Sequence, residues 1–321
     1  MPDSTAPLVS IGIPTYNRAN SYLKYALGCA VRQTYENIEI IVSDNCSPDN
    51  TESVVKEFGD SRIRYYRQTE NIGPVNNRNF CLEQSRGKYF VMLLDDDFID
   101  DDFVVTCMNA VKHHEPGVIL TGVREVDSKG NIISAYRNTV GGCSTADFIL
   151  GWFDRKLPLY LCSTVFNTKR LKELGGLHSK TNRYDDVVAY VQLAAKYGRV
   201  DIPDIKASFR RHGSSIGAAA HYSAWCEDSL YLLNIMCAVV PEHAAAIREK
   251  GLAYFSFRNY NRVAGVTPMS DRLHAYRTIY RTFNYRYSPV KFLYVKNLSR
   301  LMKLLQRKIA SKSYGFMPVV L

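Results

Sequence analysis

Gly87 to Phe98 reads GKYFVMLLDDDF: a turn glycine, an apolar run and three consecutive aspartates. The run from Tyr89 to Leu94 has the length and composition of a strand that is buried on both faces. Three carboxylates at the end of such a strand repel one another, so a site of this kind normally holds a cation or a shared proton. Oxygen ligands there suit Mg²⁺ or Mn²⁺ carrying a substrate diphosphate. The stretch alone leaves a second interpretation open, a solvated acidic turn that caps the next helix.

Strand and helix patterns alternate four times before the aspartates. Leu8 to Ile13 predicts a strand that ends in the polar loop PTYNR, and Ile38 to Val42 predicts a second one with Asp44 at its tip. Helices are expected over 19–32 and 47–58, a third strand over 62–67, and a helix that carries Arg78 after a glycine turn. This alternation predicts an α/β fold, a doubly wound and mostly parallel sheet with flanking helices, whose ligands lie off the carboxyl ends of the strands.

The pattern after the aspartates is mixed at first and then only helical. The expected elements are a helix over 100–114, a hairpin of 117–123 with 131–136, a helix over 144–154, a strand over 159–166, helices over 168–174 and 183–197, and a strand over 205–209. Beyond Ala218 only helices are expected, over 222–239, 242–261, 268–283 and 288–310. We therefore predict a domain over 1–218, divided into halves 1–97 and 98–218, and a helical C-terminal region over 219–321.

The net charge of +10 is concentrated at the C-terminal end. Residues 271–321 contain eleven lysines and arginines against one acid, Asp271, so the rest of the chain is neutral overall. The stretch 288–310 alternates apolar and basic residues at helical spacing, which predicts a basic amphipathic helix that docks on an anionic membrane surface. The alternative is a helix that packs on its neighbours with solvated charges. Nucleic-acid binding has this charge in its favour but no recognisable motif, so we expect none.

Cysteine usage and the N-terminus indicate the compartment. The eight cysteines form no CxxC pair and lie mostly in helix-like or strand-like patterns, so neither a zinc site nor a disulfide framework is expected. The first ten residues lack the basic and apolar regions of a signal peptide, and no apolar run is long enough to span a bilayer. We expect a cytoplasmic protein that docks peripherally on the inner face of the cell membrane.

Five motifs in order carry a family resemblance. They are VSIGIPTYNR, IEIIVSDNCSPDNT, ENIGPVNNRN, GKYFVMLLDDD, and later a carboxylate pair followed by an arginine-rich turn with a histidine. Together they resemble the family 2 glycosyltransferases of the GT-A fold, over roughly the first two thirds of the chain. The resemblance implies inverting transfer of a sugar from a nucleotide-diphosphate donor to a hydroxyl acceptor, a glycan or a lipid-linked glycan, with Mn²⁺ or Mg²⁺. It also implies a nucleotide-binding half over 1–97 and an acceptor and catalytic half over 98–218.

The resemblance assigns residues to the nucleotide. The loop after the first strand resembles the one that packs on the base and ribose, and Asp44 resembles the acid that accepts from the base imide. Arg78 resembles an arginine near the base and diphosphate, and Arg210 and Arg211 resemble a diphosphate clamp. Taken singly, each of these residues could be a loop cap or a surface charge; as a set they favour a nucleotide site. The residues assigned to the nucleotide are Pro14, Thr15, Tyr16, Arg18, Asp44, Arg78, Asp95, Arg210 and Arg211.

The aspartate triplet departs from the family pattern. Members usually read Asp-x-Asp-Asp here, and alignment on GKY puts Leu94 where the first Asp would be. Asp95 would then face the ribose or support the site, Asp96 would bind the metal, and Asp97 would support or share the ion. A slip of one residue would make Asp95 and Asp97 the outer pair. His212 resembles the family's late metal ligand, which gives Asp96, Asp97 and His212 as the expected metal residues.

Asp185 and Asp186 lie where the family carries a Glu-Asp pair whose Asp is the general base, so Asp186 is the expected base. Acids at a helix N-terminus, favoured by the helix dipole, are the structural alternative. Trp152, Phe153 and Tyr160 are equally consistent with stacking on sugar rings and with a place in the core. A different class of function stays open, a catalytically silent module that holds a nucleotide sugar or acts as a membrane scaffold, which would explain Leu94.

Overall fold

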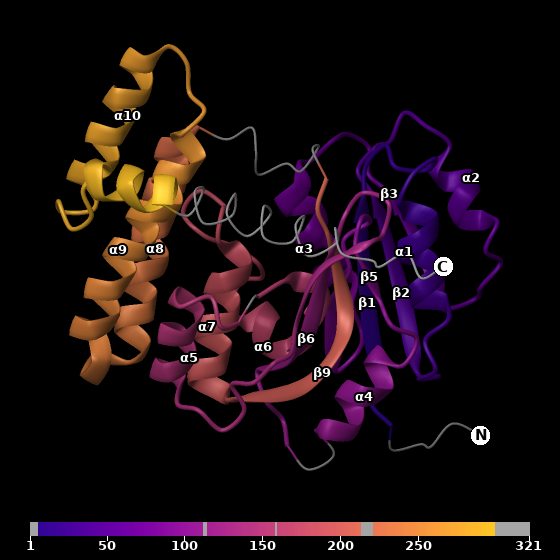
Figure 1. Ribbon diagram of the computed structural model, residues 1–321. Helices are drawn as coiled ribbons and strands as arrows, with labels where there is room; N and C mark the ends of the chain where they lie inside the picture. Colours follow the sequence, from indigo (N-terminus) through magenta and orange to yellow (C-terminus); the bar gives the residue numbers. More distant parts are fainter. Residues whose placement is uncertain (1–5, 112–113, 158, 213–220, 299–321) are drawn as a thin grey trace, which may run out of the picture.

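The computed structural model describes residues 6–111, 114–157, 159–212 and 221–298. A nine-stranded sheet runs through this part of the chain in the order β3-β2-β1-β4-β8-β6-β9-β5, and β7 pairs with β6 (Figure 1). The strands are β1 Val9–Thr15, β2 Ile38–Asp44, β3 Ile63–Arg67, β4 Tyr89–Met92, β5 Phe98–Ile99, β6 Val118–Val126, β7 Ile132–Tyr136, β8 Thr164–Asn167 and β9 Arg199–Arg210. The mixed α/β class and the mostly parallel first half are confirmed.

Helices cover both faces of this sheet because the strands are apolar on both faces. One core lies between the sheet and α1, α2 and α4, and the other lies between the sheet and α3, α5, α6 and α7. All four residues of β4 are buried, as expected of a strand in the middle of a two-sided sheet. The helices are α1 Leu23–Val31, α2 Thr51–Lys56, α3 Pro74–Gln84, α4 Phe103–Ala110, α5 Thr145–Phe153, α6 Thr168–Glu173 and α7 Asp185–Tyr197.

Strand pairing brings the polar ends of distant segments together. β3, β2, β1 and β4 are parallel neighbours, and Thr15 at the end of β1 pairs with Asp44 at the end of β2. The short strand β5, directly after the aspartates, pairs antiparallel with β9, so that Phe98 lies opposite Ser208. The segment after β9 is therefore placed beside the aspartate triplet, more than a hundred residues away in the sequence.

The C-terminal helices form a layer beside α5 and α7, on the side away from the sheet (Figure 1). They share one apolar core with those two helices. The helices are α8 Tyr222–Val239, the 3₁₀ turn η3 Pro241–His243, α9 Ala244–Val263 and α10 Met269–Thr282, and residues 289–298 are also helical. In the described part of the chain, no single helix has the length and apolar content to cross a membrane. The helix α8 and the segment Pro241–Val263 have that length and apolar content only when taken together, and the two are bent by 115° relative to each other.

Several predicted boundaries were wrong for local reasons. The helix expected from Ala19 begins at Leu23, because the Ala19 N–H donates to the Asp49 carboxylate at 3.0 Å and is held in a loop. The helix expected over 47–58 is only Thr51–Lys56, and the helix expected over 100–114 is Phe103–Ala110. Residues 161–163 form a 3₁₀ turn before β8, and β9 is longer than expected since it pairs with both β6 and β5. Most of the expected amphipathic helix, 299–310, lies outside the described residues.

Candidate active site

The first aspartate of the triplet is tied to the loop after β1. The Thr15 hydroxyl donates to Asp95 Oδ2 at 2.7 Å, so the tips of β1 and β4 are joined. Burial, together with the neighbouring Asp96 carboxylate, raises the pKa of Asp95 to about 7. A nearby cation would lower this pKa and favour the ionised carboxylate, as expected of a carboxylate that supports a cation site.

Asp97 points into the protein. It is 1% exposed, its Oδ1 accepts from the Arg210 N–H at 2.9 Å, and it lies against the thiol of Cys162. Burial, and then the charge of Asp96, raise the pKa of Asp97 well above its usual range. Asp97 therefore joins the turn after β4 to the end of β9 and lies beneath the other two aspartates.

Asp96 meets His212. The His212 Nε2 and Asp96 Oδ2 atoms lie 2.7 Å apart, and the His212 ring packs 5.3 Å from that of Tyr22 in a tilted arrangement. These two residues are the expected metal ligands that the structure brings together; whether Asp97 shares the ion stays a prediction. Within the described residues no three His, Cys, Asp or Glu side chains gather in a metal-binding group.

The donor set at this place fits a diphosphate-bound cation. Mg²⁺ and Mn²⁺ are commonly held by one or two carboxylates plus substrate phosphates and water, rather than by a complete protein cage. Asp96 supplies a hard oxygen and His212 supplies an imidazole, and a mixed set of this kind favours Mn²⁺ over Mg²⁺. The side chain of Asp96 is 20% exposed, so the pair is reachable from outside.

Arg210 already has protein partners. Its Nε donates to the backbone carbonyl of Asp96 at 2.9 Å, and its guanidinium lies 4.6 Å from the centre of the Tyr22 ring. The residue is 6% exposed. Arg210 therefore fixes the loop that carries Asp96, and its expected contact with a diphosphate stays a prediction.

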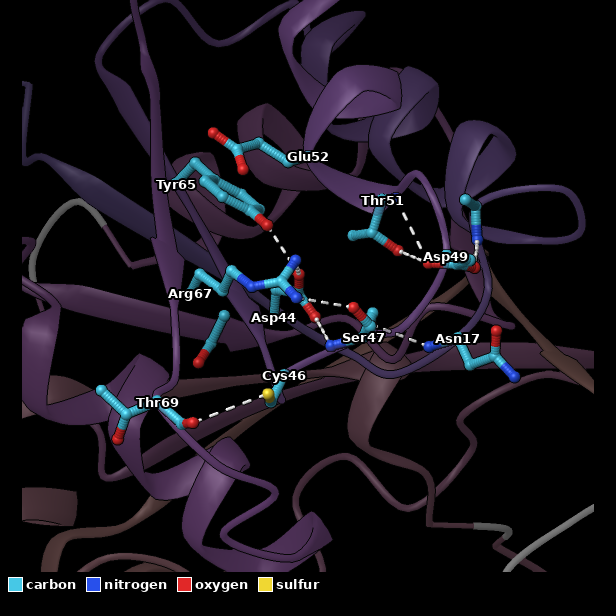
Figure 2. Close-up of polar contacts among 12 residues, drawn as sticks. Asn17, Asp44, Cys46, Ser47, Asp49, Thr51, Glu52, Tyr65, Arg67 and Thr69 are labelled. Carbon is cyan, nitrogen blue, oxygen red and sulfur yellow. Dashed lines mark hydrogen bonds and ion pairs between the residues drawn. The ribbon is translucent and has the colours of Figure 1, made fainter.

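Asp44 is the centre of a second network (Figure 2). Its Oδ1 accepts from the Ser47 N–H at 2.8 Å, its Oδ2 accepts from the Tyr65 hydroxyl at 2.6 Å, and Arg67 lies 3.5 Å away as an ion partner. The side chain is fully buried. In this conformation Asp44 holds the loop after β2, and its expected contact with a base stays a prediction.

Of the other nucleotide candidates, Pro14 lies within β1, and Tyr16 and Arg18 follow it in the loop after this strand. Pro14 is buried, Tyr16 is 46% exposed, and the Arg18 guanidinium lies over the Tyr22 ring at 5.8 Å. The exposed aromatic ring of Tyr16 beside buried strand ends is a suitable surface for a planar base.

Asp186 lines a pocket of about 1210 Å³ between the sheet and the C-terminal helices. Burial, and then the adjacent Asp185 carboxylate, raise the pKa of Asp186 to about 7. Asp185 points to Arg78, which donates a hydrogen bond to its Oδ2. The two carboxylates thus have different partners: Asp185 is ion-paired, whereas Asp186 Oδ1 accepts from the N–H of Val187 at 2.7 Å. This difference favours Asp186 as the group that exchanges a proton.

Residues at and just after the end of β9 also line this pocket. Arg211 forms a two-pronged ion pair with Glu125, and the Tyr160 hydroxyl donates to the same carboxylate at 2.6 Å. Tyr160 also stacks on Phe209, with ring centres 4.1 Å apart. Trp152 lines the same pocket, whereas Phe153 is 5% exposed and packs against Tyr254 and Phe255.

The C-terminal helices supply pocket residues that the sequence analysis did not identify. Trp225 of α8 and Tyr254, Arg258, Asn261 and Arg262 of α9 line the pocket beside Asp186. The spacing of Arg258 and Arg262, four residues apart on a helix, was the available signal, because it places both on one face. This region lies outside the stretch that carries the family resemblance, so no site residue was predicted in it.

Comparisons with known proteins bear on the family and on the fold. Residues 10–169 match the family model described as Glycosyl transferase family 2. A Rickettsia felis protein named an uncharacterized glycosyltransferase is 39% identical over 130 residues, 39% of this chain and 21% of the relative, so the chain spans about a fifth of that protein's length. A Campylobacter jejuni protein named GalNAc(5)-diNAcBac-PP-undecaprenol beta-1,3-glucosyltransferase is 27% identical over 223 residues, 66% of this chain and 69% of its own.

Solved structures share the fold. TarS 1–349 of S. aureus, in complex with UDP-GlcNAc, superposes with a TM-score of 0.58 at 14% identity, over 87% of this chain and 92% of that one. The mannosyltransferase PcManGT of Pyrobaculum calidifontis, in complex with GDP-Man and Mn²⁺, gives 0.54 at 17% identity, over 93% and 89%. The GT-A-type fold is thus confirmed, and residues 10–169 of the chain belong to glycosyl transferase family 2.

Proposed function

We propose that the protein is a metal-dependent inverting glycosyltransferase, which moves a sugar from a nucleotide-diphosphate donor to a hydroxyl of a glycan or lipid-linked acceptor. The observation that carries this proposal is the environment of Asp186. A carboxylate with a pKa of about 7, in the wall of a large pocket, is poised to take a proton near neutral pH. General bases have this property, whereas surface aspartates titrate near pH 4.

In the proposed reaction Asp186 accepts the proton of the acceptor hydroxyl. The acceptor oxygen forms a bond to the anomeric carbon of the sugar, and the bond from that carbon to the diphosphate oxygen breaks on the opposite face, which inverts the configuration. Asp185 stays paired with Arg78 and keeps the neighbouring charge in place. One carboxylate is sufficient for this displacement, because the leaving diphosphate is not protonated by the protein.

The donor is assigned to the carboxyl ends of β1, β2 and β4. Tyr16 offers an exposed ring to the base, and Asp95, held by Thr15, faces the same loop. Asp96 and His212 would hold the cation, and the cation would neutralise charge on the leaving diphosphate. Arg210 would help to position Asp96, because its Nε donates a hydrogen bond to the Asp96 backbone carbonyl. Structures of two proteins with a similar fold contain a nucleotide sugar, and one of them also contains Mn²⁺, which supports this assignment.

The acceptor is assigned to the pocket in front of Asp186. The Campylobacter jejuni relative is named for an acceptor carried on undecaprenol diphosphate, and this supports a lipid-linked glycan as the acceptor here. Polysaccharide assembly is the corresponding biological role. Tyr160, with its hydroxyl bonded to Glu125 and its ring stacked on Phe209, offers a fixed surface at the pocket wall.

The test is a panel of nucleotide sugars, each incubated with Mn²⁺ or EDTA, with release of the nucleoside diphosphate as the measurement. Metal-dependent release from one donor, lost in Asp186→Asn, supports the proposal. A silent module of the same fold would bind a nucleotide sugar, as seen by a raised melting temperature, and release nothing with any glycan or polyprenol-linked acceptor. That result would contradict an enzymatic role.

We further propose that the C-terminal region docks this cytoplasmic enzyme on an anionic membrane. Within residues 289–298, Val290 and Tyr294 are strongly exposed apolar groups next to Lys291 and Lys296, whereas Phe292 is buried in the core. Each lysine or arginine near an anionic surface contributes about 1 kcal/mol to binding, and salt weakens it. Sedimentation with vesicles containing anionic lipid should show salt-sensitive binding that is lost on deletion of 288–321. Equal sedimentation of both forms, or none at low salt, would leave these residues as a structural cap.

A further inference from the structure

Four of the arginines that line the Asp186 pocket belong to the C-terminal helices or lie over their aromatic rings. Arg258 and Arg262 come from α9, Arg183 comes from the loop before α7, and Arg155 follows α5. The pocket contains two further arginines, and both have carboxylate partners: Arg78 is paired with Asp185, and Arg211 is paired with Glu125. We call Arg155, Arg183, Arg258 and Arg262 the arginine cluster.

No member of the arginine cluster forms an ion pair with a carboxylate of the described chain. The Nε atoms of Arg183, Arg258 and Arg262 are buried and have no hydrogen-bond partner within it. Burial, and to a lesser extent the charge of Arg258, lower the pKa of Arg262. Burying guanidinium groups without counter-charges is costly, and arginine stays protonated at neutral pH. The Tyr184 hydroxyl is a neutral partner of Arg258 and Arg262, so the described residues leave the charge of these guanidinium groups unbalanced, and the arrangement favours binding of an anion.

Aromatic rings hold the cluster in shape but do not neutralise it. The Arg262 guanidinium lies 3.5 Å from the centre of the Trp225 ring, Arg183 lies over the same ring at 6.0 Å, and Arg258 lies over Tyr254 at 5.8 Å. Stacking of this kind contributes to stability and orients the flat guanidinium groups. The guanidinium groups thus have fixed orientations, as in sites where arginine binds phosphate through bidentate hydrogen bonds.

A buried carboxylate positions the loop that carries Arg183, and its oxygens already accept hydrogen bonds from that loop. Asp228 of α8 accepts from the Ser179 hydroxyl at 2.6 Å and from the N–H groups of Thr181, Arg183 and Tyr184 at 2.8, 2.6 and 2.7 Å. This set of bonds fixes the approach of the loop to α8, just before the helix that carries Asp186. The negative charge of Asp228 is directed at backbone N–H groups, so it does not serve as an ion partner of the cluster.

We infer that the arginine cluster binds a phosphate or diphosphate group of the acceptor. The inference rests on the proposed function, because it concerns the acceptor side of the same pocket. Asp186 and the cluster line one cavity, so an anion bound by α9 would place a hydroxyl of the attached glycan within the cavity that holds the base. Three partly buried guanidinium groups, whose Nε atoms have no partner among the described residues, match the several oxygens of a diphosphate better than they match a single carboxylate. The acceptor is thus an anionic, phosphate-bearing glycan and not a neutral sugar.

The test measures binding of inorganic diphosphate to the full chain by calorimetry, in buffer with EDTA, so that a metal-diphosphate complex at Asp96 does not form. Arg258→Gln and Arg183→Gln, on different elements, should each weaken binding at least tenfold, as expected for loss of a charged hydrogen-bond donor. Arg248→Gln is the matched control, because Arg248 lies on the same helix and contacts Asn234 outside the pocket. Melting temperatures show whether each variant is folded. Farnesyl diphosphate and glucose 1-phosphate, titrated in parallel, separate a lipid diphosphate from a sugar phosphate as the source of the anion.

Two outcomes overturn the inference. One is diphosphate binding that is absent, or equal in the wild type and in both folded cluster variants. The other is a cluster variant that weakens binding of the nucleotide sugar, with Mn²⁺ present, as much as it weakens binding of diphosphate, because the cluster would then serve the donor. Failure of the proposed function looks different: no nucleotide sugar would bind the wild type, while arginine-dependent binding of diphosphate would persist.

Discussion

Replacement of Asp186 by asparagine removes a proton acceptor and keeps the shape of the side chain. We expect kcat to fall by roughly a hundredfold or more, because general-base catalysis commonly contributes 10²–10⁴-fold. Donor affinity should stay nearly unchanged, since Asp186 lines the acceptor pocket and its protein hydrogen bond is to the N–H of Val187. In the wild type, kcat/KM should rise about tenfold per pH unit below pH 7 and level off above it, because the pKa of Asp186 in the protein without substrate is about 7.

The same substitution should also change how the free energy of unfolding depends on pH. The pKa of Asp186 rises from 3.8 to about 7 on folding, so the folded protein binds more protons than the unfolded chain between those pH values. The free energy of unfolding therefore falls as pH rises through this window. A shift of about 3 pH units corresponds to about 4 kcal/mol, which is an upper limit because the side chain is not fully buried. Asp186→Asn should thus be more stable than the wild type at pH 8 and similar to it at pH 4.

The assay combines steady-state turnover with urea unfolding at pH 4, 6 and 8. Asp147→Asn is a suitable control, because Asp147 also lies in the first turn of a helix but is exposed and outside the pocket. Two results would refute the reasoning: equal loss of donor binding and turnover in Asp186→Asn, which would make the residue structural or metal-binding, or a stability difference from the wild type that does not change with pH.

Three further substitutions test other parts of the account. Asp96→Asn should remove metal-dependent activity with the fold intact, and wild-type turnover at limiting Mn²⁺ would contradict the assignment. Asp228→Asn should lower the free energy of unfolding by about 2–4 kcal/mol, measured in urea, because three backbone N–H groups and a hydroxyl lose a charged acceptor; an unchanged unfolding midpoint would count against it. Tyr65→Phe should cost about 1 kcal/mol by thermal unfolding, since buried Asp44 loses a hydrogen bond.

The first half of the fold could be predicted from the sequence because the local strand and helix patterns there agree with the sheet that forms. Apolar runs that end in polar loops predicted β1, β2, β3 and β4, and the parallel pairing of these strands follows from the helices between them. The bounds of α8 were predicted without error, because its apolar spacing is continuous. The start of α1 was missed, since it depends on a tertiary bond from the Ala19 N–H to Asp49.

The family resemblance supplied the candidate site residues and the expectation that Asp96 and His212 share an ion, but the sequence did not predict the contacts that hold these residues in place. The meeting of Asp96 with His212 depends on the antiparallel pairing of β5 with β9, and a two-residue strand leaves no periodic signal. The enclosure of Asp44 by Tyr65 and Arg67 depends on the register of β2 with β3. The arginine cluster depends on how α9 packs against α5 and α8, which a helical pattern does not specify.

The most direct test of the central claim is the melting temperature of the wild type and Asp96→Asn with a panel of UDP-, GDP- and dTDP-sugars, each with Mn²⁺ or EDTA. A ligand that binds only the folded state raises the apparent stability, by about 2.7 kcal/mol at a hundred times its dissociation constant. The account predicts that at least one nucleotide sugar stabilises the wild type, that Mn²⁺ increases the effect, and that Asp96→Asn loses the increase due to Mn²⁺. A wild type that no nucleotide sugar stabilises, with or without Mn²⁺, would contradict it.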